Sequence, residues 1–252
     1  MQGVTPDSLL ALHDAGYRAV AAKVGAGRLL DLGCGQGFES VRLIGPDRRV
    51  VGVDYSLDAV EHAATIHAGS GLSVARTDAL SLCIGEGSFD YVCSSHLIEH
   101  FERPAGHVEE MARVLKPSGQ ALILTPNAPA DFENPFHIHL FDADELRSLL
   151  SRHFTDVWVG GLDATDVVKA DFGARRERAA RVLSLDLFDL RHKMPRSWYV
   201  AGYTRVLPLA YRIMARSDTG GASGITADDF FVTDHIDDTT LVLFAIAGKP
   251  RR

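Results

Sequence analysis

The chain has 252 residues, of which 46% are hydrophobic and 23% are charged, a balance that excludes a disordered chain, a collagen-like repeat and a disulfide-stapled mini-protein. The net charge of −7 argues against a general binder of nucleic acid or of anionic membranes. One large domain, or one domain that carries an insertion, fits this length better than two equal domains.

Short apolar runs alternate with amphipathic segments of helical length from residue 5 to about 160. This alternation is typical of a parallel sheet with helices on both faces. The predicted strands are 28–32, 49–53, 72–76, 89–93, 120–125, 154–160 and 239–247. The predicted helices are 36–44, 56–69, 104–115 and 142–152. Ser56 and Asp142 are expected to be N-caps, and KPSG at 116–119 is expected to end a helix and turn into the next strand.

The alternation stops after residue 161. We interpret residues 162–229 as a helical cap inserted into one domain that is formed by residues 1–161 and 230–252. The cap is predicted to contain two helix-like stretches and a loop, at about 171–191, 198–215 and 217–229. Its second stretch carries four aromatic residues that can stack on a ring, Trp198, Tyr199, Tyr203 and Tyr211. We expect this cap to lie beside the mouth of the site and to select the ligand.

No targeting signal is apparent in the sequence. The first twenty residues carry charged side chains where a secretory signal needs an unbroken apolar run. The longest apolar stretch, 241–248, is far shorter than the ~20 residues that span a bilayer. The three cysteines, Cys34, Cys83 and Cys93, are too few for a disulfide framework or a metal cage. We therefore expect a protein without a membrane span in the reducing cytoplasm.

The strongest local signal is LLDLGCGQG at 29–37. A predicted buried strand ends in Asp31, and Gly33, Gly35 and Gly37 follow at alternate positions just before a predicted helix. Glycines at such a point let the backbone turn tightly and approach a ligand more closely than a Cβ atom permits. The alternative is a plain turn between a strand and a helix.

Acidic residues follow the next two strands. Asp54 stands seventeen residues after Gly37, in position to accept hydrogen bonds from both hydroxyls of a ribose. Asp78 and Ala79 follow the third strand, where a carboxylate and backbone groups can bind the amine and the ring edge of an adenine. Because the carboxyl ends of neighbouring parallel strands meet at one edge of a sheet, these residues indicate one crevice for a nucleoside.

Five motifs stand in the order found in class I S-adenosylmethionine-dependent methyltransferases, namely LLDLGCGQG, VVGVDYS, RTDAL, GSFDYVCSSHLIEHFERP and RVLKPSGQALILTPN. The chain resembles this family over about residues 5–160 and the last strand. The resemblance implies an α/β, Rossmann-like sheet of seven mostly parallel strands, of which the last runs antiparallel.

The resemblance also implies a binding site for the methionine part of S-adenosylmethionine. Asp31 and the loop Gly33–Gly37 would hold this part from one side. Ser94, just after the fourth predicted strand, would approach it from the other side. Cys34 looks like the small residue that is common inside this loop, and no redox role is expected for it.

The nucleoside part of the cofactor would lie further along the same edge of the sheet. The resemblance implies that Asp54, which Tyr55 follows, binds the ribose. It implies that Asp78 and Ala79 bind the adenine, in agreement with the spacing described above.

A dinucleotide-dependent dehydrogenase is a rival with the same fold. Its glycines are spaced G-x-G-x-x-G to fit a pyrophosphate, whereas here they run G-x-G-x-G and Phe38 stands in place of the third glycine. A module that binds the cofactor without catalysis is an alternative from another class.

The fourth predicted strand leads into SSHLIEH, in which His96, Glu99 and His100 are spaced i, i+3 and i+4. On a helical turn this spacing puts all three side chains on one face. Three such ligands can hold Mg²⁺ or Mn²⁺, which lowers the pKa of a bound hydroxyl. The segment resembles the acid-x-x-Glu-His element of some quinone-pathway O-methyltransferases, with His in the first position. The alternatives are local packing of Glu99 and His100, or the H-x-x-E-H signature of inverted zinc proteases, which needs a long helix.

A second cluster of polar residues lies at 125–146, after the fifth predicted strand. His137 is the first candidate for a general base, because imidazole titrates near neutral pH. His139 is an equal candidate for the base or for completing a metal site, and His96 is a third. The alternative is that His137 and His139 are ordinary loop residues.

Missing motifs narrow the choice of methyl acceptor. The fourth strand is not followed by the N/D-P-P-Y/F element of enzymes that methylate nucleic-acid amines, and Cys93 lies at a strand end rather than in a catalytic loop. We therefore expect no nucleic-acid partner and a hydroxyl group on a small molecule. The insertion, SSHLIEH and NPFHIHLF together resemble bacterial methyltransferases of polysaccharide and secondary-metabolite pathways, which favours a saccharide. A phenol or quinone precursor is the alternative, and the oligomeric state is left open.

Overall fold

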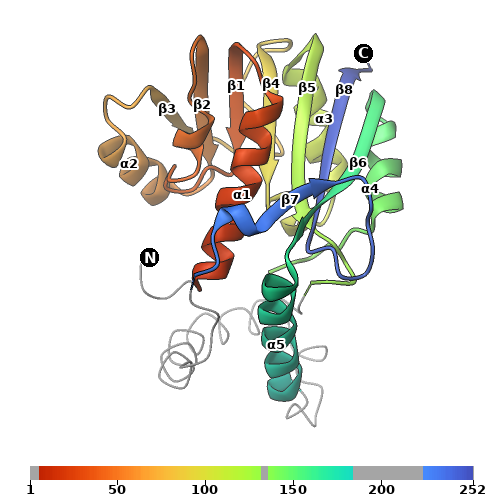
Figure 1. Ribbon diagram of the computed structural model, residues 1–252. Helices are drawn as coiled ribbons and strands as arrows, with labels where there is room; N and C mark the ends of the chain where they lie inside the picture. Colours follow the sequence, from red (N-terminus) through yellow and green to blue (C-terminus); the bar gives the residue numbers. More distant parts are fainter. Residues whose placement is uncertain (1–5, 132–135, 184–223, 252) are drawn as a thin grey trace.

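The computed structural model describes residues 6–131, 136–183 and 224–251. Its centre is one eight-stranded sheet with the order β3-β2-β1-β4-β5-β8-β6-β7 (Figure 1). The strands are β1 (Gly27–Leu32), β2 (Arg48–Asp54), β3 (Leu72–Arg76), β4 (Phe89–Ser95), β5 (Leu115–Pro126), β6 (Phe154–Ala164), β7 (Phe230–Thr233) and β8 (Val242–Pro250). Strands β1 to β5 are parallel to one another, whereas β8 runs antiparallel to both of its neighbours, β5 and β6.

The sheet confirms the predicted Rossmann-like α/β fold and contains one strand more than predicted. All seven predicted strands are present, and the last one is antiparallel as expected. The additional strand, β7, pairs antiparallel with the end of β6. Its four residues follow a polar loop and are too few to show a clear alternation of apolar and polar side chains.

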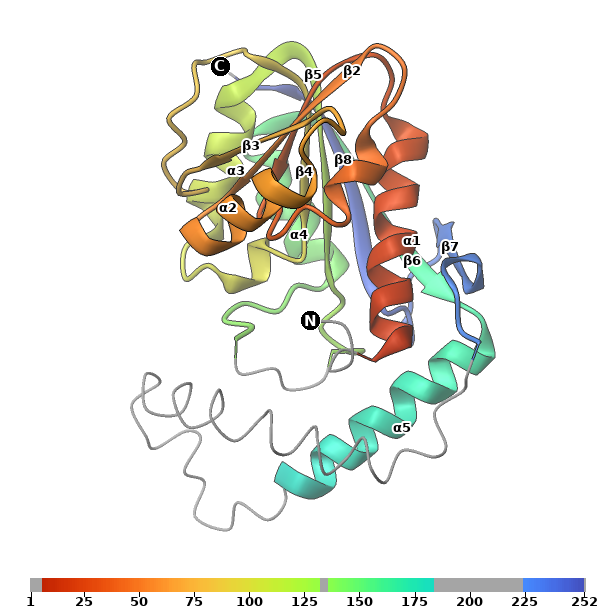
Figure 2. The same cartoon turned by 90° about the vertical axis from the view of Figure 1, so that its left-hand side faces the viewer.

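Helices cover both faces of the sheet (Figure 2). They are α1 (Asp7–Lys23), α2 (Leu57–Ile66), α3 (Pro104–Val114), α4 (Ala143–Ser151) and α5 (Asp166–Leu183), with short 3₁₀ helices η1 (Ser40–Leu43), η2 (Ile98–His100) and η3 (Ala227–Asp229). Successive strand residues point to opposite faces, so Leu29 packs in the core under α1 and Leu30 in the core under α3 and α4. In the described part of the chain, no helix is both long and apolar enough to cross a bilayer.

Helix α1 is absent from the predicted elements, although its side chains form much of one core. Gly16 stands in its middle, and glycine lowers helix propensity by about 1 kcal/mol relative to alanine. The structure explains why a glycine stands there, because a Cβ atom at Gly16 would lie 3.0 Å from the Leu124 side chain of β5. Close packing against the sheet therefore outweighs the weak local propensity.

One predicted helix is wrong. The helix expected over 36–44 is reduced to η1, because Gly35 and Gly37 adopt left-handed backbone angles, with φ of 52° and 76°, that interrupt a helix. The prediction that a helix ends at KPSG, residues 116–119, is confirmed, because α3 ends at Val114. The segment then bulges out of the ladder with β4, since Leu115 pairs with Phe89 and the next paired residue, Gln120, with Tyr91. The predicted N-caps are present, because Ser56 accepts a hydrogen bond from the amide of Ala59, and the Asp142 carboxylate accepts one from the amide of Glu145.

The predicted start of the insertion falls inside β6, which continues to Ala164. Helix α5 then extends away from the sheet (Figure 1) and corresponds to the first predicted helix of the cap, although it begins earlier than residue 171. The second predicted helix, 198–215, and its aromatic residues lie outside the described residues. The division into a main domain and a cap at 162–229 stays a prediction.

Candidate active site

The glycine loop after β1 has the open, tightly turned form that a bound ligand requires. Gly33, Gly35 and Gly37 all have positive φ, and a Cβ atom at Gly33 or Gly37 would come within 3.1 Å of neighbouring side chains. A Cβ atom at Gly35 would meet nothing within 4 Å. Gly35 therefore borders open space, whereas the other two glycines are needed for the turn itself.

Asp54 holds this loop from the end of the neighbouring strand β2. One carboxylate oxygen accepts a hydrogen bond of 2.8 Å from the amide of Gly35, and the other accepts one of 2.8 Å from the amide of Ser56. The side chain is only partly buried, and each of its oxygens has a second lone pair to offer. Tyr55 is 70% exposed beside it, with the guanidinium of Arg76 5.5 Å above its ring.

Asp31 lies near the end of β1, just before the glycine loop. It is completely buried, and its carboxylate accepts hydrogen bonds from the hydroxyls of Tyr17 on α1, at 3.2 Å, and of Ser40 in η1, at 2.5 Å. Burial raises the pKa of Asp31 to about 6, although these two hydrogen bonds oppose the rise. The residue therefore ties α1 and η1 to the end of β1 and acts on the glycine loop indirectly.

Ser94, at the end of β4, is also completely buried. Its hydroxyl lies 2.9 Å from Nε2 of His107 on α3. The other ring nitrogen of His107 lies 3.2 Å from the carbonyl oxygen of Ala79. The structure thus links two predicted cofactor residues, Ser94 and Ala79, through a histidine that no sequence motif singles out.

The loop after β3 brings the predicted adenine residues to the same edge of the sheet. Asp78 is exposed, and one of its carboxylate oxygens accepts a hydrogen bond of 2.9 Å from the amide of Leu80. The amide of Thr77 donates to the carbonyl of Asp54, which joins this loop to the predicted ribose residue. Cys34, in the glycine loop, packs against Gly52, and burial raises the pKa of its thiol to about 12, which fits a structural small residue without redox chemistry.

Glu99 is the centre of a second group of polar residues at the carboxyl end of β4. It lies in η2 and is completely buried. One carboxylate oxygen accepts a hydrogen bond of 3.1 Å from the hydroxyl of Thr125, and the other, Oε1, has no hydrogen-bond partner among the described residues. Burial would raise the pKa of Glu99, but nearby His96 and His100 outweigh it and lower the pKa. A buried, ionised oxygen without a partner is costly and calls for a cation or a donor.

His96 does not lie on a common helical face with Glu99 and His100. The 3₁₀ helix covers only residues 98–100, and His96 has a φ of 50°, which is unusual for a residue with a side chain. Its Nδ1 lies 3.6 Å from Glu99 Oε1, too far for a hydrogen bond. Its ring packs edge-on against His13 of α1, at 4.6 Å between centroids. Burial, followed by the nearby His96, lowers the pKa of His13 to about 3, so His13 is neutral.

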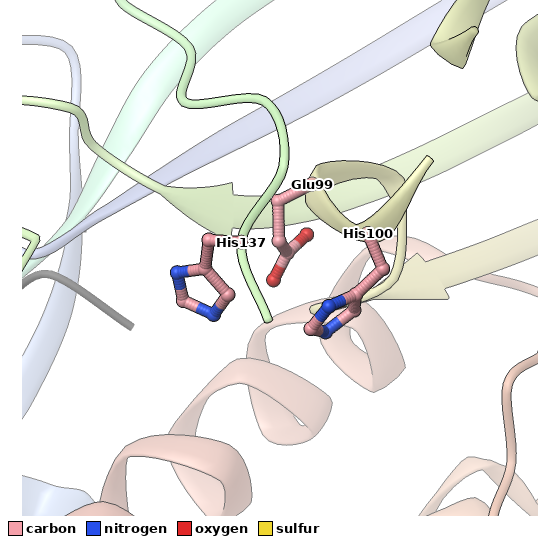
Figure 3. Close-up of side chains that lie close together, drawn as sticks. All are labelled: Glu99, His100 and His137. Atoms are coloured by element: carbon pink, nitrogen blue, oxygen red, sulfur yellow. The ribbon is translucent and has the colours of Figure 1, made fainter. Parts of the chain in front are cut away.

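The spacing predicts that His96 groups with Glu99 and His100. In the structure, His137 lies beside these two residues instead (Figure 3). Glu99, His100 and His137 each offer a ligand atom, and these atoms lie within 4.8 Å of one another. Nδ1 of His100 lies 2.8 Å from the carbonyl oxygen of Phe136, and Nδ1 of His137 lies 2.7 Å from a carboxylate oxygen of Asp131. Because both partners accept hydrogen bonds, Nδ1 of each neutral ring carries the proton and Nε2 is the basic nitrogen.

His139 is separated from this cluster. Its ring packs on Phe141 at 4.3 Å between centroids, and it lines an open groove of about 840 Å³ between α3 and α4. The backbone amides of Ile138 and His139 donate to the carbonyl of Glu99, which fixes the loop that carries His137 against η2. Of the two loop histidines, only His137 therefore faces Glu99 and His100.

The comparison with known proteins decides between the families that share this fold. Residues 30–123 match the family model of the methyltransferase domain. This part of the chain is a methyltransferase domain, and its similarity to S-adenosylmethionine-dependent methyltransferases supports class I of that family. This assignment favours the methyltransferase over the dehydrogenase alternative, in agreement with the spacing of the glycines.

Curated relatives of this methyltransferase domain match part of the chain. A probable S-adenosylmethionine-dependent methyltransferase of Mycobacterium tuberculosis is 34% identical over 60% of this chain and 57% of that protein. A ubiquinone biosynthesis O-methyltransferase of Burkholderia vietnamiensis is 34% identical over 46% of this chain and 53% of that protein. The chain thus spans about half the length of the curated relatives it matches.

Solved structures support the fold of the methyltransferase domain at low sequence identity. A possible histamine N-methyltransferase of Thermotoga maritima has a TM-score of 0.62 and 15% identity, covering 96% of this chain and 91% of that one. The [4+2]-cyclase SpnF has a TM-score of 0.59 and 20% identity, covering 94% of this chain and 81% of that one. Because proteins of such different chemistry share the fold, the activity has to be argued from the site.

Several residues of the site are absent from the sequence motifs. His13 and Tyr17 stand on α1, where i, i+4 spacing puts both on the face toward the sheet. His107 is on the buried face of α3, and Asp131 is one of several acidic residues in the loop of His137. Treating residues 7–23 as an amphipathic helix would have indicated His13 and Tyr17. The roles of His107 and Asp131 depend on tertiary packing alone.

Proposed function

We propose that this methyltransferase domain transfers the methyl group of S-adenosylmethionine to a hydroxyl group of a small molecule. One observation carries the proposal: the Glu99–His100–His137 cluster follows β4, the neighbour of β1, whose end opens into the glycine loop. When bound, S-adenosylmethionine supplies an electrophilic methyl group on a sulfonium. A hydroxyl becomes an effective nucleophile only when a positioned group takes its proton, and this cluster supplies such groups.

The residues around the glycine loop fit the cofactor. Gly35 borders open space, and the carboxylate of Asp54 lies beside it with lone pairs for ribose hydroxyls. Tyr55, Asp78 and Ala79 stand at the same edge of the sheet and are proposed to contact the nucleoside. Asp31 and Ser94 support the site through buried hydrogen bonds instead of touching the cofactor.

We infer that His137 is the general base. Asp131 accepts a hydrogen bond from Nδ1, which orients the ring and leaves Nε2 as the nitrogen that takes the proton of the acceptor hydroxyl. The carboxylate also stabilises the imidazolium that forms. His139 lacks such a carboxylate partner among the described residues and lies in the groove between α3 and α4.

A divalent cation is the second candidate at this cluster, favoured by the buried Oε1 of Glu99, which has no hydrogen-bond partner in the described part of the chain. We propose Glu99, His100 and His137 as its ligands, in place of the set with His96 that the spacing predicts. Backbone and carboxylate partners on the Nδ1 atoms of His100 and His137 are the usual support of metal-bound histidines. Two imidazoles and one carboxylate suit Mn²⁺ better than Mg²⁺. Such an ion would lower the pKa of the bound hydroxyl, and His137 would then be a ligand and not the base.

The sequence and the curated relatives favour different classes of methyl acceptor. The saccharide expected from the sequence stays a proposal. A phenol or quinone precursor gains support because some curated relatives are named ubiquinone biosynthesis O-methyltransferases. Screening oligosaccharides, phenols and quinone precursors with labelled S-adenosylmethionine separates the two classes. Label on only an amine or a carboxylate would contradict methylation of a hydroxyl group.

Replacing Asp54 by alanine is expected to weaken binding of S-adenosylhomocysteine by at least ~1.5 kcal/mol, or roughly tenfold, because charge-assisted hydrogen bonds are lost. The loop also loses the contact between Asp54 and the amide of Gly35. Isothermal titration calorimetry measures the change. Asp58→Ala, an exposed aspartate in the first turn of α2, is the matched control and should bind like the wild type. Preferential binding of NAD by the wild type would overturn the proposed function.

If the cluster binds the cation, removal of metal with EDTA is expected to reduce turnover at least tenfold, the scale seen when metal sites are perturbed, with Mn²⁺ restoring it better than Mg²⁺. Glu99→Gln has nearly the same shape but lacks the charge, so added Mn²⁺ should rescue it poorly. Full turnover in EDTA would exclude the cation and leave His137 as the base.

A further inference from the structure

One face of α3 holds the chain segment that follows β3. His107, Glu110 and Arg113 stand at i, i+3 and i+6, so they project from the same side of the helix. All three bind backbone atoms of residues 79–84. This segment carries no regular structure beyond an isolated bridge between Asp78 and Ser81, and side chains of α3 therefore define its path.

The second half of this segment, residues 82–84, is held by an ion pair on α3. Glu110 accepts a hydrogen bond of 2.7 Å from the amide of Leu82, and Arg113 donates to the carbonyls of Leu82, at 3.0 Å, and Ile84, at 2.8 Å. Arg113 also donates to Glu110 at 2.7 Å, and this hydrogen bond is the main cause of the lowered pKa of Glu110. The pair thus holds residues 82–84, away from the predicted adenine site.

Of these three α3 side chains, His107 is the one that contacts the part next to the predicted adenine site. The carbonyl oxygen of Ala79 can only accept a hydrogen bond, so Nδ1 of His107 must carry the proton and donate it. Nε2 is then an acceptor, and the hydroxyl of Ser94 donates to it. The ring is completely buried and packs on Phe101, and burial lowers its pKa to about 4, so this tautomer persists at neutral pH.

The strand pairing of the sheet does not fix the position of Ala79 relative to β4. Strands β3 and β4 are separated by β2 and β1, so the loop after β3 has no ladder to β4. His107 bridges this separation, since one ring nitrogen contacts Ser94 at the end of β4 and the other contacts Ala79. A shift of the Ala79 carbonyl would move the neighbouring Asp78 carboxylate and the Ala79 backbone together.

We propose that His107 is a positioning residue that sets the purine specificity of cofactor binding by fixing the backbone at Ala79. The inference rests on the proposed function, in which Asp78 and Ala79 contact the adenine. An adenine amine donates to a carboxylate at Asp78. The carbonyl that replaces this amine in hypoxanthine cannot donate and is repelled by the same carboxylate. Discrimination between these bases therefore depends on where the loop holds Asp78.

Two substitutions at the same position test this role. His107→Asn places an amide donor near the position of Nδ1 and can keep the hydrogen bond to Ala79. His107→Gln places its amide near the position of Nε2, so it can contact Ser94 but loses Ala79. The dissociation constants of S-adenosylhomocysteine and of S-inosylhomocysteine, its hypoxanthine analogue, are measured by calorimetry for each variant. Lys116→Met, which breaks an ion pair with Asp90 at the opposite end of β4, controls for general destabilisation.

We expect the wild type, the Asn variant and the Lys116→Met control to prefer the adenosyl compound about tenfold or more, the scale of one charge-assisted hydrogen bond. In the Gln variant the two constants should come within about threefold of each other. Discrimination kept by the Gln variant, or lost by a folded Asn variant, overturns the inference and leaves the proposed function intact. A wild type that binds neither compound overturns both.

Discussion

Replacing His137 by alanine is expected to lower kcat about 100-fold or more, at the lower end of what a general base contributes. The loss is expected for both proposed roles of this residue, because His137 is the candidate base paired with Asp131 and also a ligand candidate beside Glu99 and His100. The KM for S-adenosylmethionine should change little, since His137 is not among the residues around the glycine loop. Initial rates at saturating concentrations of both substrates measure the effect.

His139→Ala is the comparison for this experiment, because His139 belongs to the same loop but lines the groove between α3 and α4. Its kcat should stay within about twofold of the wild type. Unchanged turnover of the His137 variant would instead assign the base to His139 or His96, or to no side chain. Asp131→Asn is expected to be intermediate, because it keeps a partner for Nδ1 but removes the charge that stabilises the imidazolium.

Replacing Asp31 by asparagine is expected to change how the stability depends on pH. Burial raises the pKa of Asp31 to about 6 in the folded protein, whereas the ordinary value is 3.8. The folded state therefore binds this proton more tightly than the unfolded state between these pH values. The corresponding stability is fully present below pH 3.8 and is lost as the pH rises through 6, which amounts to about 3 kcal/mol.

Asparagine cannot ionise but can still pair with the hydroxyls of Tyr17 and Ser40. Its amide oxygen can accept a hydrogen bond from one hydroxyl, and its NH₂ group can donate one to the other. The free energy of unfolding is measured in urea from pH 4 to pH 7 for both proteins. The stability of the Asp31→Asn variant relative to the wild type should increase with pH over this range, since only the wild type must bury a charge. A constant difference between the two proteins would contradict the raised pKa.

The helices and strands that could be predicted are those in which the local sequence pattern favours the same structure as the packing of the folded core. The buried runs of β1, β2 and β4 and the caps Ser56 and Asp142 are legible because apolar patterning and capping chemistry are local properties. Helix α1 is missing from the predicted elements and the helix over 36–44 is wrong, for related reasons. In α1 a glycine needed for packing weakens the helical signal, and in 36–44 glycines needed for the turn prevent a helix that the periodicity favours.

In the candidate site, too, some residues could be placed from the sequence and others could not. Gly35, Asp54 and Asp78 could be placed at one edge of the sheet from the sequence, because each ends or follows a strand and parallel strands end at one edge. The replacement of His96 by His137 could not, since it depends on the left-handed conformation of His96 and on the loop amides that bind the Glu99 carbonyl. Residues that act through others, such as His107, become apparent only when both ends of their hydrogen bonds are known.

The position of β8 has a consequence for the synthesis of the protein. β8 lies between β5 and β6, but the ribosome makes it after every other strand described here. Until residues 242–250 have emerged, β5 and β6 each present an unpaired backbone edge in the nascent chain. The parallel half of the sheet, β1 to β5, can assemble during translation, whereas the half that contains β6 must wait. Chaperone binding to the nascent chain is therefore expected to be strongest after β6 has emerged and before β8 is complete.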